Sequence, residues 1–171
     1  MSFFKRLFGI GPDPKDALRP LWHTVVGEAR QPEWYARYGV ADTLEGRFDM
    51  ITAIMALVIL RMDRTPELTA KTAYLTELFV EDMDGQLRQS GLGDPTVGKY
   101  IGKLVSAMGG RIGGFREGLS KEGRTMGEVV AANMTLTDDA DAKALGARLS
   151  KTHAGLAAVS DEELLAGRLA P

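Results

Sequence analysis

Side chains able to support acid–base or metal chemistry are few in this chain, and their spacing fits no recognised catalytic motif. The chain has no cysteine, so a disulfide, a thiolate metal site and a cysteine nucleophile are all excluded. Its two histidines, His23 and His153, lie far apart in the sequence, and no acidic residue accompanies either in a recognisable motif. A histidine-based metal or haem site is therefore weakly supported.

One acidic run, Glu81-Asp82 followed by Asp84, raises the question of a divalent metal site. Consecutive residues of a helix point in different directions, and neither a second acidic motif nor a calcium-loop pattern accompanies this run. A faint likeness to isoprenoid enzymes rests on these acids and the helical pattern alone. We therefore predict no metal, no other cofactor and no enzymatic activity.

The composition is that of an ordinary globular chain. The 171 residues fit one domain, or one domain with tails, with 44% hydrophobic and 26% charged residues. A net charge of -2 argues against a dominant nucleic-acid partner. The longest apolar run, residues 50–60, is shorter than the roughly 20 residues that a membrane span requires.

The first twelve residues, MSFFKRLFGIGP, form an expected amphipathic or flexible tail. Its charges interrupt the apolar residues, which is not the order of a signal peptide, so we expect a cytoplasmic protein. As a helix, the tail could lie at a membrane interface and hold the protein at the inner face of the inner membrane. Folding back onto the domain and disorder remain alternatives. The residues expected to contact the membrane are Phe3, Phe4, Lys5, Arg6, Leu7 and Phe8.

The most fully specified turn is the sequence GLGDP, which separates two long helical patterns between residues 74 and 119. Gly91 and Gly93 can adopt the positive φ that ends a helix. Asp94 followed by Pro95 is typical of an N-cap and the first helical residue. We therefore predict a helix that ends near residue 90 and a second long helix that follows the corner.

Apolar residues recur at helical spacing along the rest of the chain, which predicts an all-α, mostly antiparallel single domain. Residues 42–62 are apolar on most sides, so their helix should be buried at the centre. We expect Pro20 to kink the first helix and Thr137 to cap the helix from 138. The remaining expected helices cover 14–30, 32–38, 67–90, 125–134, 138–158 and 160–169.

Asp42 is an N-cap candidate, and Thr125–Glu128 and Ser160–Glu163 have the spacing of capping boxes. The alanine-rich C-terminal region is expected to pack peripherally.

Glycines are unusually frequent in the helix after the corner, where each costs about 1 kcal/mol against alanine. Close helix packing, a break near Gly109-Gly110 and deliberate looseness each explain them, and close packing is favoured.

The same region has an excess of cations, which predicts a basic outer face. It is an ordinary solvated face or a steering surface for an acidic partner, a nucleic acid or a lipid headgroup. These cations are Lys99, Lys103, Arg111, Arg116, Lys121 and Arg124.

Three stretches together resemble the ubiquinol–cytochrome c chaperone family, whose members assemble the respiratory cytochrome bc1 complex. They are YGVADTLEGRFDMITAIMALVILRM (38–62), LFVEDMDGQLRQSGLGDPTVGKYIGKL (78–104) and GGRIGGFREGL (109–119). The second is the most specific, and the likeness is strongest over residues 34–124. It implies a helical domain over 13–134, and residues 135–171 would form a C-terminal helical extension packing on it.

The chain departs from the family pattern at two places. Met108-Gly109 stands where an aromatic pair is expected, and Ala53 and Ile54 stand where the buried helix would carry a histidine. The resemblance implies a non-enzymatic assembly factor that binds newly made cytochrome b, or another bc1 subunit, near the membrane.

The expected mode of binding is a groove between helices that accepts an apolar segment of the client. Its walls would be the inner face of residues 74–87 and the glycine-lined helix after Pro95. A core role is the preferred interpretation for Phe79, Leu87 and Leu104 and the alternative for the other side chains. A small lipid- or hydrophobe-binding module is the alternative function. A dry apolar cavity would favour that module, and a filled core with a surface groove would favour the chaperone. The candidate partner-binding residues are Tyr74, Phe79, Met83, Leu87, Tyr100, Lys103, Arg111, Phe115 and Arg116.

Overall fold

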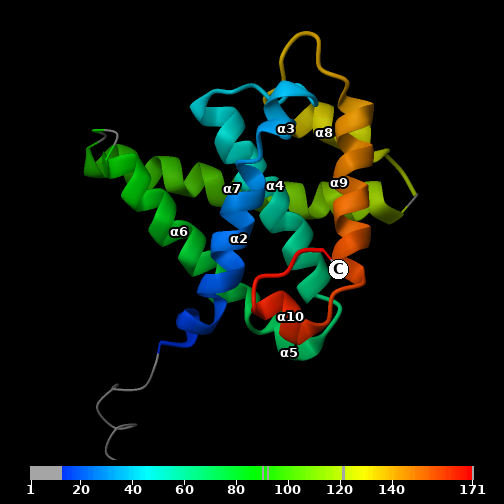
Figure 1. The fold of residues 1–171 in the computed structure, drawn as a ribbon. Helices are drawn as coiled ribbons and strands as arrows, with labels where there is room; N and C mark the ends of the chain where they lie inside the picture. The colour runs from blue at the N-terminus through cyan, green and yellow to red at the C-terminus, as the bar shows by residue number, and fades with distance from the viewer. Residues whose placement is uncertain (1–12, 90, 92, 121, 171) are drawn as a thin grey trace, which may run out of the picture.

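The computed structural model describes residues 13–89, 91, 93–120 and 122–170, which fold into one all-helical domain, as predicted (Figure 1). The described residues form no strand beyond an isolated bridge between Val40 and Leu136. None of their helices is long and apolar enough to cross a membrane. The expected membrane contacts from Phe3 to Phe8 lie outside the described residues. The elements are η1 (Pro14–Leu18), α2 (Arg19–Ala29), α3 (Pro32–Ala36), α4 (Leu44–Met62), α5 (Pro66–Thr69), α6 (Thr72–Gln89), α7 (Asp94–Ser120), α8 (Met126–Asn133), α9 (Ala142–Ala157) and α10 (Asp161–Leu165).

Helix α4 is the centre of the fold. Every residue from Met50 to Met62 is buried, and α2, α7 and α9 pack around the helix. The central, buried position predicted from its sequence is therefore confirmed. Its N-cap is Thr43 rather than Asp42, because the Thr43 hydroxyl accepts the Gly46 N–H at 3.2 Å. Asp42 instead pairs with Arg47 at 2.7 Å.

Two expected helices are each divided. Residues 14–18 form a 3₁₀ turn, and α2 starts at Arg19, so Pro20 lies in the first turn rather than at a kink. Proline is tolerated there because its missing N–H has no helical acceptor. The expected helix over 67–90 is interrupted after Thr69, and only α6 continues, from Thr72 to Gln89.

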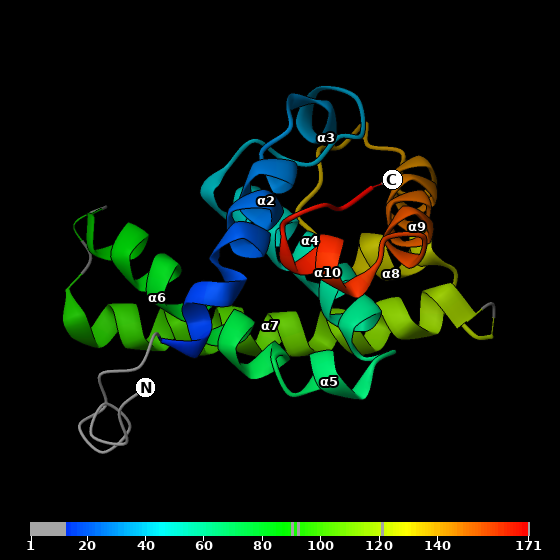
Figure 2. The ribbon, with the colours of Figure 1, turned by 60° about the horizontal axis from the view of Figure 1, so that its bottom comes forward.

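Helices α6 and α7 form a hairpin that extends to one side of the molecule, and α7 runs along one whole face (Figure 2). Gly91 has the predicted positive φ, +88°, whereas Gly93 does not. Asp94 is the first residue of α7 rather than its cap. The Gly93 carbonyl accepts the N–H groups of Thr96 and Val97 at 2.9 and 3.0 Å.

The C-terminal helices pack into the core rather than at its periphery. Leu145, Leu149 and Leu156 of α9 are fully buried. The capping boxes predicted at Thr125–Glu128 and Ser160–Glu163 are both present. Two boundaries differ from the expectation: α9 begins after the cap residue Asp141 instead of Thr137, and α10 ends at Leu165.

Candidate functional site

Four of the predicted partner-binding side chains lie inside the core. They are Phe79, Met83, Leu87 and Phe115, and none is more than 1% exposed. The inner face of α6 packs on α2 and α7, and the Phe79 and Trp22 rings make an edge contact, so the groove expected along residues 74–87 is closed. The structure corrects that expectation and agrees with the core alternative for these residues. Of the other candidates, Tyr74 and Tyr100 are partly exposed, and Lys103 and Arg116 are exposed.

Arg111 is also internal, which corrects its assignment to a basic outer face. Its side chain is 4% exposed and donates to the Asp49 carboxylate, the Thr52 hydroxyl and the Asn133 carbonyl. The other Asp49 oxygen accepts the N–H and hydroxyl of Thr135, each at 2.7 Å. Arg111 therefore joins α7 to α4 and to the end of α8.

The remaining cations of this region form a smaller basic surface than predicted. Arg116 pairs with Asp63 at 3.0 Å, and Arg124 pairs with Glu117 at 2.9 Å. Lys121 lies outside the described residues. Lys99 and Lys103 are exposed on α7 and form no ion pair within the described part of the chain.

The glycines of α7 divide into two groups. Gly114 and Gly118 meet α8: an added Cβ would lie 2.8 Å from a Val129 methyl and 3.0 Å from the Met126 Cα, respectively. Close packing is confirmed for these two. The others have nothing within 4 Å of an added Cβ, and α7 continues unbroken through Gly109-Gly110. The open positions are Gly98, Gly102, Gly109, Gly110 and Gly113.

The acidic run at residues 81–84 and the two histidines do not come together in the fold. Two of the acids form ion pairs with basic side chains, and the histidines lie on different helices. Glu81 binds Lys15, and Asp84 pairs with Arg88 at 2.6 Å. His23 is exposed on α2, and His153 is half-buried on α9. Across the described ranges, no group of three or more His, Asp or Glu side chains could hold a metal ion.

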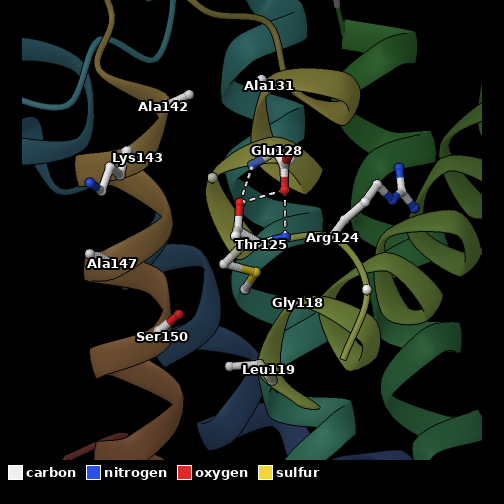
Figure 3. Close-up of a pocket in the computed structure, with 13 residues that line it drawn as sticks. Gly118, Leu119, Arg124, Thr125, Glu128, Ala131, Ala142, Lys143, Ala147 and Ser150 are labelled. Carbon is white, nitrogen blue, oxygen red and sulfur yellow. Dashed lines mark hydrogen bonds between the residues drawn. The ribbon is translucent and has the colours of Figure 1, made fainter. Parts of the chain in front are cut away.

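A groove of about 880 Å³ lies where the end of α7 meets α8 and α9 (Figure 3). Its walls are mostly glycine, alanine and aliphatic carbon, and its charged side chains come from Arg124, Glu128 and Lys143. This mostly apolar surface is suited to binding another apolar surface. The lining residues are Gly118, Leu119, Gly123, Arg124, Thr125, Met126, Gly127, Glu128, Ala131, Ala142, Lys143, Ala147 and Ser150.

Local hydrogen bonds fix the turn that leads into this groove. The Glu128 carboxylate accepts the Thr125 N–H at 2.7 Å and its hydroxyl at 2.8 Å, and these bonds lower the pKa of Glu128. Glu117 accepts from the Arg124 side chain and backbone, which lowers the pKa of Glu117. Both carboxylates are therefore charged at neutral pH and hold the start of α8 in place.

Helices α8 and α9 meet at glycines, which leaves the groove open on one side of their crossing. A Cβ on Gly146 would lie 2.6 Å from the Gly127 nitrogen, so the two backbones are in contact there. Sequence reasoning did not identify this groove. The available signals were the glycines at 127 and 146 and the small side chains of α9, which indicated peripheral packing instead.

The comparisons with known proteins agree with this architecture. A family model described as "Ubiquinol-cytochrome C chaperone" matches residues 36–170. The crystal structure of the Cbp3 homolog from Brucella abortus superposes with a TM-score of 0.77 at 28% identity, covering 98% of this chain and 96% of that one. A search of curated proteins found no match. The resemblance seen in the three sequence stretches is confirmed.

Proposed function

The chain belongs to the ubiquinol-cytochrome C chaperone family, and we propose that it holds an apolar helical segment of newly made cytochrome b in the groove between α7, α8 and α9. The family role is that of a non-enzymatic assembly factor for the cytochrome bc1 complex. The identity of the client and its place of binding are our proposal.

The observation that carries the proposal is a filled core beside an open apolar groove. The interior around α4 is closed, with Trp34, Phe79 and Phe115 among its fully buried side chains. A hollow of about 880 Å³ instead lies at the surface, as expected for a protein that binds part of another chain. A lipid-binding module would require an enclosed apolar cavity, so the arrangement favours a client-binding chaperone over that alternative.

The shape of the groove suits a helix. The residues of α9 that line it, from Ala142 to Ser150, span two turns of the helix (Figure 3). Three of these four side chains are small, namely Ala142, Ala147 and Ser150, and the fourth is Lys143. Small walls allow another helix to approach closely, and an amphipathic helix in an apolar groove is a recurring mode of recognition. An unassembled membrane subunit exposes helices of this kind, which would otherwise aggregate in water.

The residues at which the chain departs from the family pattern do not line the groove. Ala53 and Ile54 are fully buried in α4, and Met108 is buried where α7 packs on the core. They therefore affect packing inside the domain. The predicted membrane contact of the N-terminal tail remains a prediction, and it would place the groove near the site where cytochrome b is made.

Two neighbouring alanines of α8 allow a matched test. Ala131 lines the groove, whereas Ala132 is exposed and does not line it. In cells lacking the native gene, Ala131→Trp should lower cytochrome b haem absorbance and bc1 activity, because the indole fills the groove. Ala132→Trp should restore both to the native level.

Unchanged melting temperatures of the two purified variants would show that folding does not cause the difference. Equal bc1 activity for both variants would reject the groove as the client site. Normal cytochrome b spectra in the gene deletion itself would reject the assembly role altogether.

A further inference from the structure

A second hollow, of about 370 Å³, adjoins the groove and differs from it in charge. It lies between the C-terminal ends of α4 and α7 and the later part of α9. Leu119 lines both hollows, so the two adjoin at this side chain. The residues of the second hollow are Leu60, Asp63, Arg64, Arg116, Leu119, Ser120 and His153.

The second hollow has an excess of positive charge. Arg116 is balanced by Asp63 at 3.0 Å, but the exposed Arg64 guanidinium has no ion pair or hydrogen bond among the described residues. His153 is half-buried beside them, and burial together with the Arg64 charge lowers the pKa of its imidazole. Within the part of the chain that the structure describes, Arg64 is therefore a cation without a partner, and it lies beside the apolar groove.

The two hollows lie along a single face of α9. Their lining residues run from Ala142 to His153, a length of about 16 Å at 1.5 Å per residue. This length accommodates about three turns of a bound helix. An occupant that fits both parts is apolar over most of its length and anionic at one end.

We propose that the Arg64 end of the groove binds a carboxylate carried by an apolar helical segment, with the acid between Arg64 and His153 and the apolar part along α9. The inference rests on the proposed function and adds a ligand chemistry to it. The carboxylate sets the direction and register of the client helix, which an apolar groove lined by small residues does not define on its own.

A helical segment fits these observations better than a phospholipid. The groove is open and lined by helices at helical spacing, whereas an acyl chain requires enclosure on most sides. Arg64 presents a planar fork that matches a carboxylate, and its exposed position allows a side chain of another protein to reach it.

The test uses a blocked apolar helical peptide of roughly 12 residues, with one glutamate near one end, and its glutamine counterpart. Fluorescence anisotropy should show the glutamate peptide binding about fivefold more tightly. This preference should disappear in Arg64→Gln and persist in Lys151→Gln, which removes an exposed cation of α9 outside both hollows.

An NMR titration gives an independent readout, because the chain has only two histidines. The glutamate peptide should raise the pKa of His153 relative to the glutamine peptide. Its carboxylate would lie near the imidazole, among Arg64, Arg116 and Asp63, and a nearby negative charge favours the protonated imidazole. His23 lies in a different hollow, with Arg19 and Asp82, and its signals should not move.

Equal affinities for the two peptides, or a preference that survives in Arg64→Gln, would overturn the carboxylate site while leaving the groove intact. Failure of both peptides to bind would also overturn it. The Ala131 and Ala132 variants would then judge the chaperone function separately. Arg64-dependent binding to phosphatidylglycerol vesicles without peptide binding would assign the site to a lipid headgroup and reject the proposal.

Discussion

Arg111 of α7 is paired with Asp49 of α4 inside the domain, and the same carboxylate accepts two hydrogen bonds from Thr135. Three segments distant in sequence are therefore held at one point. The pair also fixes the direction in which α7 leaves the core, and the candidate groove is built at the far end of α7.

The first prediction concerns this pair. Arg111→Met keeps the length of the side chain but leaves Asp49, whose side chain is 17% exposed, without its cation. We expect a loss of about 3 kcal/mol in the free energy of unfolding, because breaking a buried pair strands one charge. Urea denaturation measures it.

The control is Arg47→Met, which removes an exposed arginine of α4 paired with Asp42. Its cost should be much smaller, because surface ion pairs contribute little to stability. Similar losses in the two variants would contradict a structural role for the buried pair.

The open glycines of α7 predict stabilising substitutions. Gly109→Ala meets no atom within 4 Å and removes a flexible residue from a helix interior. It should raise the free energy of unfolding by about 0.5–1 kcal/mol. Gly118→Ala should not, because its Cβ would lie 3.0–3.1 Å from Met126 backbone atoms. Melting temperatures of the two variants distinguish these outcomes. Destabilisation by Gly109→Ala would contradict the open surroundings of Gly109 on α7.

The crossing of α8 and α9 predicts a larger effect at Gly146. An alanine there would place its Cβ 2.6 Å from the Gly127 nitrogen, so the helices must separate. We expect a loss of roughly 1–3 kcal/mol, typical of overpacking. Gly155→Ala is the matched control on α9, since the added Cβ would lie 3.9 Å from the Leu169 carbonyl oxygen, an ordinary van der Waals contact. A neutral Gly146→Ala in chemical denaturation would argue against the close crossing.

Asp161 predicts a pH dependence. The Arg61 side chain donates to it at 2.6 Å and lowers the pKa of Asp161, with a smaller contribution from Thr65. A lowered folded-state pKa means that this stabilisation is complete above the unfolded value of about 4 and is lost as pH falls through the folded value.

Asp161→Asn removes that charge. The gap in unfolding free energy between the native protein and Asp161→Asn should therefore narrow as pH falls below about 4. Asp138→Asn, at an exposed residue before α9, should show no such gap. A gap that is constant from neutral to acidic pH would exclude the Arg61–Asp161 pair as its source.

The sequence by itself determined the features that depend on neighbouring residues. Capping boxes at Thr125–Glu128 and Ser160–Glu163, the glycine turn at Gly91 and the all-round apolar pattern of residues 50–62 are local signals, and each is present as predicted. The family resemblance was also contained in contiguous stretches, and the family model confirms it.

Only the tertiary structure decided which side chains are available to a partner. Arg111 has the same helical context as exposed cations, and only the approach of Asp49 makes it internal. Phe79 and Phe115 have apolar faces that suit a groove or a core. The packing of α6 on α2 and α7, and of α7 on α4, buries both side chains. The groove is lined by residues 118–150 of three successive helices. Its shape depends on how α8 and α9 cross at Gly127 and Gly146, which no local pattern specifies.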